Sequence, residues 1–299
     1  FAGASVVFLI ISVMHVKGIG ATITTTLSFA VFSVIVGTGQ MLVMTTGPGN
    51  IDLSIPSVMT LGGAIAMKVM NESAANIPHA LIFAVLAGIA IGVVNYGIIW
   101  LLRIPPIIAT LSTNLIVLSI AITYERGLRI HPPDAFYNFT VAKVFGIPVL
   151  AIVVVIFTVI MSVVLSRTVY GRSIIAIGQN PRAARLVGIK FHRIKLITYV
   201  FSALFAAVAG SLLASFSGGS SLDLGNEYLM GSIAVVIIGG TNVAGGDSNV
   251  AGIWGAALFL YLLRNMLNTF GISEGLRLAL TGIVIVGVIV LSGGKKERI

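Results

Sequence analysis

The residues of this chain that could do chemistry are polar side chains set into very apolar sequence. They gather at two interruptions of the apolar pattern, residues 45–57 (TTGPGNIDLSIPS) and residues 239–249 (GGTNVAGGDSN), here called the first and the second break. Each break holds glycine, asparagine and one aspartate. Their amide, hydroxyl and carboxyl groups can form hydrogen bonds to a small solute or contact an ion.

Two roles compete for the aspartate of the first break. Asp52 or Ser54 is a good N-cap residue for a helix that is entered through Pro56, since proline suits the first turn of a helix. We expect capping to be the main role of Asp52, and contact with a solute or ion to be the alternative. Asp247, in the second break, is expected to be an ordinary loop residue.

The composition indicates a membrane protein. The 299 residues are 57% hydrophobic and only 9% charged, with a mean hydropathy of +1.08, whereas a soluble domain of this length needs more charge to cover its surface. Of the 18 Lys and Arg residues, seven lie in residues 167–195 and three in residues 295–298. This clustering is typical of cytoplasmic loops and tails of membrane proteins. Without a basic face that alternates with aromatic residues, it argues against nucleic-acid binding. The chain has no cysteine, which excludes disulfides and thiolate catalysis.

The apolar runs predict an all-α polytopic membrane protein with about ten transmembrane segments, some of them broken or re-entrant, since several runs have the roughly 20 residues that a helix needs to cross a bilayer. The runs are residues 1–14, 27–46, 53–67, 80–102, 104–124, 144–166, 196–217, 228–240, 250–263 and 278–292. Those at 53–67, 228–240 and 250–263 are short enough to be buried core helices or half-helices. Residues 1–299 are interpreted as a single transmembrane domain. Because the chain opens on Phe1 inside an apolar run, its N-terminus is expected to be truncated.

The arrangement of the segments follows from small and basic residues. Ala84, Gly88 and Gly92 recur every four residues, which predicts close helix packing. If the basic loop 167–195 and the basic tail 295–298 are both cytoplasmic, the four segments between them return the chain to the same side. Counting back places Arg103 inside and the loop 125–143 outside.

Both breaks free backbone groups that hydrocarbon cannot satisfy, so we expect them to lie against protein or in a water-filled cavity. Corresponding breaks in the two halves of a chain indicate a transport pathway and a loosely repeated two-half organisation. Asn95, Asn114, Asn265 and Asn268 lie in or beside apolar segments, where an unpaired amide is costly. Helix–helix hydrogen bonding explains each of them singly. Several amides directed into one cavity would suit a neutral, hydroxyl-rich solute.

A short basic helix is predicted within the loop 167–195, at residues 178–189 (GQNPRAARLVGI). Asn180 followed by Pro181 is typical of an N-cap with proline in the first helical position, and Gly188 of a helix end. About two turns of helix are too short to be stable alone and must pack on something. The helix is interpreted either as a basic loop on anionic lipid headgroups or as a docking helix for a cytoplasmic partner.

Four segments of the chain carry a resemblance to a known family: GQNPRAARLVGIKFHRIKLITYVFSALFAAVAG, GNIDLSIPSVMTLGGA, RIPPIIATLST and SIAVVIIGGTNVAGG. They resemble segments of ribose-type (monosaccharide) ABC importer permeases, and they follow the order and spacing of that family from about Met41 to Leu291. The basic helix is similar to the permease pattern EAA-x-x-x-G, with Arg182 where glutamate is usual. Pro56 stands where the family has glycine, and Gly47-Pro48-Gly49 is an unusual approach to that segment.

The resemblance implies one of the two membrane subunits of an importer in the bacterial inner membrane. Its implied partners are a periplasmic solute-binding protein, a cytosolic ABC ATPase and a second permease copy or paralogue, besides membrane lipid. The ATPase would contact the loop 167–195 at the coupling residues Gly178, Asn180, Arg182, Ala183, Ala184, Arg185 and Gly188. This chain has no G-x-x-x-x-G-K-[ST] motif, so ATP and magnesium are expected on the ATPase, with no cofactor, metal or enzyme activity here.

The solute predicted from the resemblance is a neutral monosaccharide. Candidate pathway residues are Asn50, Asp52, Ser54, Asn95, Thr110, Asn114, Phe216 and Asn242, most of which are uncharged hydrogen-bonding groups. An amino-acid zwitterion would favour fixed charges or bare helix ends. Nucleosides, autoinducer-type furanoses and branched-chain amino acids stay open as alternatives. An ion-coupled secondary transporter is disfavoured by the few acidic residues in the spans, and a membrane enzyme by the absence of H-E-x-x-H and G-x-S-x-G.

Overall fold

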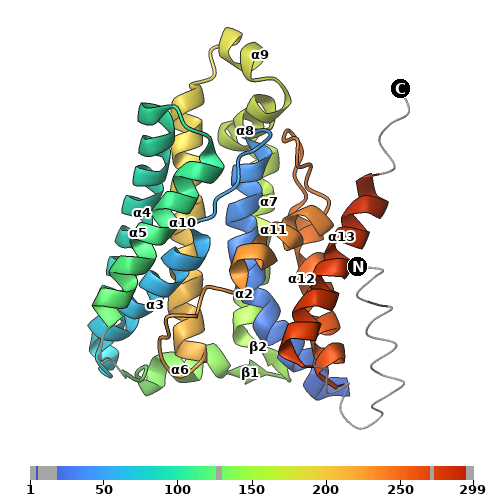
Figure 1. The fold of residues 1–299 in the computed structure, drawn as a ribbon. Coiled ribbons are helices and arrows are strands. Elements are labelled where there is room, and N and C mark those ends of the chain that lie inside the picture. The colour runs from blue at the N-terminus through green and yellow to red at the C-terminus, as the bar shows by residue number, and fades with distance from the viewer. Residues whose placement is uncertain (1–4, 6–18, 126–129, 270–272, 294–299) are drawn as a thin grey trace.

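The computed structural model describes residues 5, 19–125, 130–269 and 273–293 as a helical bundle with one short β-hairpin (Figure 1). In chain order the elements are α2 (Ile19–Thr45), α3 (Ile55–Met70), the 3-10 helix η1 (Ala74–Asn76), α4 (Ile77–Leu102), α5 (Pro106–Glu125), α6 (Asp134–Val141), β1 (Lys143–Val144), β2 (Ile147–Pro148), α7 (Val149–Arg167), α8 (Val169–Gln179), α9 (Pro181–Leu186), α10 (Phe191–Phe216), α11 (Tyr228–Ile238), α12 (Val250–Thr269) and α13 (Glu274–Gly293). Strands β1 and β2 pair antiparallel, with Lys143 opposite Pro148.

Within the described residues, six helices are long and apolar enough to cross a membrane. They are Gly20–Thr45, Ala74–Leu102, Pro106–Glu125, Val149–Arg167, Phe191–Phe216 and Val250–Asn268. Helices α3 and α11 are apolar but shorter, as expected. The all-α polytopic fold is thus confirmed, whereas a count of about ten spans is not. The run 1–14, except Ser5, and the tail 295–298 lie outside the described residues.

One of the expected segments is longer than the apolar pattern suggested. The run 250–263 was expected to be a short segment, but it forms the first part of the 20-residue helix α12. Arg264, Asn265 and Asn268 end the apolar run without ending the helix. The correction has a physical reason, since a polar residue stops a hydropathy run, whereas a helix stops where its backbone can no longer continue the hydrogen-bond ladder.

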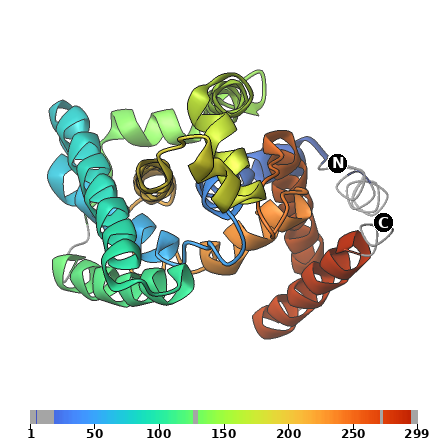
Figure 2. The ribbon, with the colours of Figure 1, turned by 90° about the horizontal axis from the view of Figure 1, so that it is seen from above.

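Helices α2 and α10 form the centre of the bundle. α2 packs against α7, α10, α11 and α12, and α10 packs against α2, α3 and α4. Seen along the bundle axis, both helices lie inside a ring formed by the others (Figure 2). The first break connects α2 to α3, and α10 passes beside both of these helices, so the central pair positions the break.

The two ends of the bundle carry different elements. α8, α9, the end of α2, the α4–α5 connection and the second break lie at one end, at the top of Figure 1. The β-hairpin and α6 lie at the opposite end. Arg103, in the α4–α5 connection, therefore shares the α9 end, and the described part of the loop 125–143 lies opposite. This is the relative placement that the basic residues predicted.

Glycine and alanine allow the helices to approach closely, as predicted for the stripe on α4. Ala84, Gly88 and Gly92 are buried, and a Cβ added at Gly92 would overlap the backbone of Val200 in α10. Further along α10, a Cβ added at Gly210 would overlap the backbone of Met59 in α3. Backbone contact of this kind is the usual basis of helix association in lipid.

We predict that Gly210→Ala destabilises the bundle by about 1–3 kcal/mol, the usual cost of overpacking a tight contact. The added methyl group meets rigid backbone atoms of Met59, which cannot move away as a flexible side chain would. The measurement is the midpoint of thermal denaturation of the purified protein in detergent. Gly97→Ala in α4 is the matched control, because a Cβ there meets nothing within 4 Å. Equal midpoints for the two variants would contradict the packing argument.

Candidate coupling and permeation site

The first break turns the chain back into the bundle after α2. Gly47 and Gly49 adopt φ values of +130° and +71°, which L side chains rarely reach. Asn50 then anchors the turn, because its Nδ2 donates to the carbonyl of Gly47 at 2.9 Å. Its Oδ1 accepts from Nζ of Lys195 in α10 at 2.9 Å. The break is therefore tied to the first turns of α10.

Asp52 is the centre of the polar contacts in this break and is only 1% exposed. One carboxyl oxygen accepts from the amide and the hydroxyl of Ser54, at 3.0 and 2.6 Å. The other accepts from the hydroxyl of Ser202 in α10, at 2.7 Å. Asn95 of α4 donates to the Ser54 hydroxyl at 2.8 Å. These contacts make Asp52 a junction between the break, α4 and α10.

Helix α5 supplies two further partners of the break. The amide of Leu53 donates to the hydroxyl of Thr110 at 3.0 Å, and the amide of Ser57 donates to Oδ1 of Asn114 at 3.3 Å. Ser57 is in the first turn of α3, where backbone amides lack helical partners. Asn114 thus satisfies the start of α3 from a neighbouring helix.

The expected capping of α3 by Asp52 or Ser54 is not formed. Ser54 is the N-cap residue, but its side chain makes no capping hydrogen bond. Its hydroxyl donates to the carboxyl of Asp52 instead. The same carboxyl accepts from the amide of Ser54, but this amide precedes the helix and is not one of its free amides. The prediction was wrong because tertiary partners outside the local sequence compete for these groups.

The structure brings six of the eight candidate pathway residues together and leaves two apart. Asn50, Asp52, Ser54, Asn95, Thr110 and Asn114 belong to the contacts of the first break. Phe216 ends α10, where its ring packs edge-on against Phe29 at 5.3 Å between centroids. Asn242 lies in the second break and closes a local turn, accepting from the amide of Ala244 at 3.0 Å.

The two breaks contact one another at the α9 end of the bundle. The amide of Gly246 in the second break donates to the carbonyl of Thr45, where α2 ends, at 2.9 Å. A Cβ added at Gly245 would overlap Gly47 in the first break. A Cβ added at Gly178, the predicted coupling residue near the end of α8, would overlap both Thr45 and Gly246. Three backbone segments therefore meet at glycines, where any larger side chain would prevent the contact.

The short helix α9 begins with the predicted cap. Oδ1 of Asn180 accepts hydrogen bonds from the amides of Arg182 and Ala183, both at 3.0 Å. Pro181 occupies the first helical position, where its missing N–H costs nothing. The N-cap prediction is confirmed.

The end of α9 is also as predicted. Gly188 adopts φ +82°, and its amide donates to the carbonyl of Arg185 at 3.1 Å. The amide of Ile189 reaches back to the carbonyl of Ala184 at 3.0 Å. This pair of bonds is the Schellman motif, which favours glycine because of its left-handed backbone.

The outer face of α9 is exposed and mixed in character. Leu186 and Val187 are 89% and 77% exposed, whereas Ala184 is only 3% exposed. Ala183 and Arg182 lie on the exposed side as well. Two large apolar side chains at the tip of a polar loop are unusual for a surface that meets only water, and they are typical of a contact with protein or membrane.

The chain after α9 leads back to the first break through ring contacts. The guanidinium of Arg185 lies 4.5 Å from the ring centroid of Phe191. Nζ of Lys195 lies 5.0 Å from the same centroid and donates to Asn50. Both ends of α9 are thus connected to the first break, one through Gly178 and the other through Lys195.

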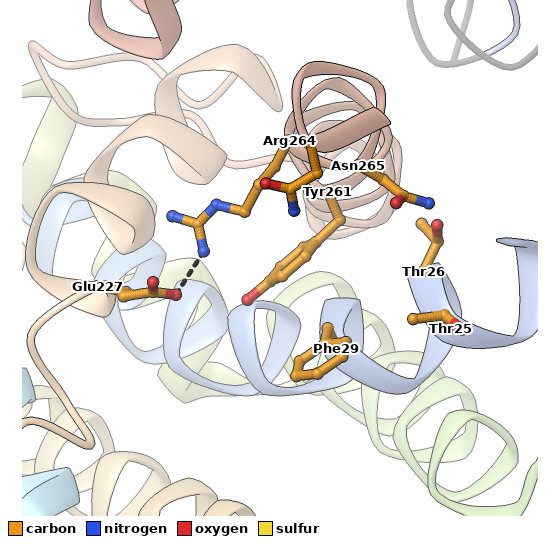
Figure 3. Close-up of a pocket in the computed structure, with 8 residues that line it drawn as sticks. Thr25, Thr26, Phe29, Glu227, Tyr261, Arg264 and Asn265 are labelled. Carbon is orange, nitrogen blue, oxygen red and sulfur yellow. Dashed lines mark hydrogen bonds and ion pairs between the residues drawn. The ribbon is translucent and has the colours of Figure 1, made fainter. Parts of the chain in front are cut away.

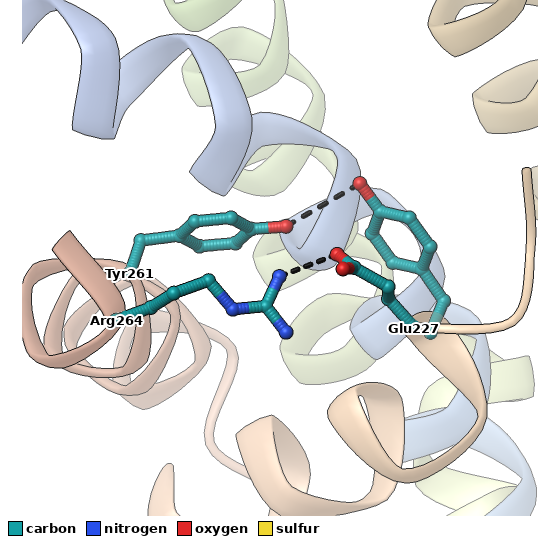
Figure 4. A network of polar contacts seen from close by, with 4 residues as sticks. Glu227, Tyr261 and Arg264 are labelled. Atoms are coloured by element: carbon teal, nitrogen blue, oxygen red, sulfur yellow. Dashed lines mark hydrogen bonds and ion pairs between the residues drawn. The ribbon is translucent and has the colours of Figure 1, made fainter. Parts of the chain in front are cut away.

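A separate pocket of about 270 Å³ lies between α2 and α12. Figure 3 shows its polar and aromatic lining, with the guanidinium of Arg264 directed at the carboxylate of Glu227, to which it is ion-paired. The hydroxyl of Tyr261 donates to that of Tyr228 at 3.3 Å beside this ion pair (Figure 4). The sequence pattern does not predict this site, although Asn265 and Asn268, two of the amides in or beside apolar segments, are part of its lining.

The described residues contain no group of three or more His, Asp or Glu side chains that could hold a metal ion. Contacts of the first break are hydrogen bonds between neutral groups, apart from the Asp52 carboxyl and the Lys195 ammonium. This arrangement holds a broken helix inside the bundle through buried polar groups that are paired with one another.

A polytopic helical bundle with broken segments and an exposed, capped helix defines the membrane component of a transporter. The family model described as "Branched-chain amino acid transport system / permease component" matches residues 22–290. The chain belongs to this permease family. It is a multi-pass permease component of an ABC-type importer in the bacterial inner membrane.

Individual relatives agree with the family. The autoinducer 2 import system permease protein LsrD of Escherichia coli strain K12 is 32% identical over 257 residues, which cover 83% of this chain and 77% of that protein. The proteins of the same name from Shigella flexneri and from E. coli O157:H7 have the same identity and coverage. No solved structure matches the chain at a significant level.

We predict that Asp52→Asn lowers the stability of the protein by about 1–3 kcal/mol, the cost of leaving buried hydrogen-bonding groups without partners. An amide has one acceptor oxygen, so it cannot accept from Ser54 and Ser202 as the carboxyl does. The measurement is the thermal denaturation midpoint in detergent. The control is Asp247→Asn, at an exposed position where the carboxyl accepts from the amide of Ser248. The proposed role of Asp52 would be refuted by equal midpoints.

Proposed function

We propose that this chain is the solute-conducting subunit of an ATP-driven importer, and that α9 is its contact with a cytosolic ABC ATPase. The observation that carries the proposal is the exposed apolar tip of α9, with Leu186 and Val187 projecting from a helix whose two ends are both connected to the first break. Family membership supports the same role, since a permease component works with other subunits.

Contact with the ATPase would reach the first break by two routes. On one side, α8 carries Gly178 directly against Thr45 and Gly246. On the other side, Phe191 lies between Arg185 of α9 and Lys195, which holds Asn50. A displacement of α9 would therefore move the turn at Asn50 and the end of α2 together. In this proposal, that movement changes the access of the solute between the two sides of the membrane.

The proposal assigns the other subunits to separate surfaces. ATP and magnesium are bound by the ATPase at the α9 end, and a periplasmic binding protein delivers solute at the end that carries α6 and the β-hairpin. A second permease copy or a paralogue completes the membrane part. In this proposal, the membrane domain has ten segments in two loosely repeated halves, and α3 and α11 are short segments among them.

We propose a monosaccharide or a related furanose as the solute. The names of the relatives support a furanose-like molecule, because each is called a permease of an autoinducer 2 import system. The neutral hydrogen-bonding groups around the first break support a hydroxyl-rich solute. A branched-chain amino acid is the second candidate, since the family description names that class.

We predict that Leu186→Cys and Ala183→Cys cross-link to the ABC ATPase of the same transporter in native membranes. The chain has no cysteine of its own, so each variant carries a single reactive thiol. Ala184→Cys is the matched control, because that residue lies in the same helix but is 3% exposed. Mass spectrometry of the cross-linked product identifies the partner. Products that contain lipid or no ATPase at either exposed position would refute the assignment of α9.

We predict that Gly178→Ala uncouples ATP hydrolysis from transport. The added methyl group would separate α8 from Thr45 and Gly246 without touching the exposed face of α9. The assembled transporter in proteoliposomes should keep its ATPase activity but lose most solute uptake for each ATP hydrolysed. Gly231→Ala in α11, where a Cβ meets nothing within 4 Å, should behave as the unaltered protein. Normal coupling in Gly178→Ala would contradict transmission through this contact.

A further inference from the structure

One face of α12 carries a stripe of polar residues. Tyr261, Arg264, Asn265 and Asn268 follow the spacing i, i+3, i+4, i+7, which places them on the same side of a helix. All four line the pocket between α12 and α2 (Figure 3). α12 is long and apolar enough to cross a membrane, and polar residues in such a helix face the protein interior or a water-filled cavity rather than lipid. The stripe therefore indicates a hydrated space.

The opposite wall of the pocket comes from the first turns of α2. Thr25, Thr26 and Phe29 face the stripe, and Glu227, which precedes α11, closes one side. Because α2 begins and α12 ends away from α9 (Figure 1), the pocket lies toward the end opposite the coupling helix. Its volume of about 270 Å³ is at the lower limit of small-molecule sites, which suits a solute of monosaccharide size.

An unpartnered hydroxyl in the wall points to a ligand. Thr26 is 4% exposed, and its Oγ1 forms no hydrogen bond among the described residues. A buried polar atom without a partner costs free energy, and here it belongs to a residue that lines the cavity. The Oγ1 atom itself is buried, so the Thr26 side chain would have to rotate toward the cavity for a solute hydroxyl to become its partner.

The aromatic residues give the pocket an apolar surface. Phe29 and Tyr261 are stacked at 6.0 Å between ring centroids, and Phe216 packs edge-on against Phe29. The charged groups of Arg264 and Glu227 are paired with one another, so the pocket has no net charge from them. Neutral polar groups beside an apolar platform match a molecule with hydroxyl groups and C–H faces.

We propose that this pocket between α2 and α12 binds a neutral, polyhydroxylated solute of monosaccharide size on its way through the permease. This inference rests on the proposed import function, and it assigns a solute site that is separate from the first break.

The test uses single cysteines in the full chain, reconstituted in nanodiscs. Thr26→Cys and Thr25→Cys are labelled with a small water-soluble methanethiosulfonate, with D-ribose, D-xylose, D-glucose or L-leucine as the probe. At a probe concentration about ten times its Kd, labelling at both positions should slow about tenfold, because only the free pocket reacts. Thr123→Cys in α5, which lines a different cavity, is the control and should be labelled at the same rate with and without sugar.

A second variant tests the unpartnered hydroxyl. In the double variant Thr25→Cys, Thr26→Val, one hydrogen bond to the solute is lost. The sugar concentration that gives half-maximal protection of the thiol from labelling should therefore rise about fivefold. Protection by L-leucine and by none of the sugars would overturn the solute class. Lack of protection by every probe would overturn the pocket itself. The cross-linking of α9 to the ATPase is an independent measurement, so either result leaves the importer role standing if those cross-links form.

Discussion

The structure depends on how the backbone of the first break is satisfied. Where α2 stops and α3 has not yet begun, amides and carbonyls lack helical partners, and hydrocarbon cannot replace them. Side-chain oxygens of Gln40, Thr110 and Asn114 accept hydrogen bonds from three backbone amides in the break and the first turn of α3. The carboxyl of Asp52 accepts hydrogen bonds from Ser54 and Ser202. Since these side chains come from α2, α5, α10 and the break itself, the helices can pack in few other ways without leaving a buried amide unpaired.

The same break is where the proposed coupling enters the bundle. Its turn rests on glycines and on Asn50 rather than on a continuous helix. The contacts at Gly178 and Lys195 approach the turn from two directions. The 27-residue helix α2 lies on one side of the turn and the shorter α3 on the other. In the proposed coupling, displacement of the turn would be passed to α3.

Local signals in the sequence predicted local structure well. Asn180, Pro181 and Gly188 defined α9 because a cap and a Schellman end depend on neighbouring residues alone. The stripe at Gly88 and Gly92 predicted a closely packed helix face, because the spacing along one helix is local, but it did not predict that the partner would be α10. The role of Asp52 as a junction was not predictable, because its partner Ser202 is 150 positions away in the chain. The sequence does not predict the pocket because Glu227 and Arg264 meet only in three dimensions, and because the apolar run ends after Tyr261, before the other three residues of the polar stripe.

The exposed tip of α9 also bears on how the protein is made. Leu186 and Val187 are exposed in the subunit alone. Under the proposed ATPase contact, a newly inserted subunit would present them to the cytosol until its partner covers them. Because exposed apolar side chains are bound by chaperones and recognised by proteases, unassembled copies would then be shorter-lived than assembled ones. The end of one six-residue helix would in this way balance the amount of permease against the amount of its partner.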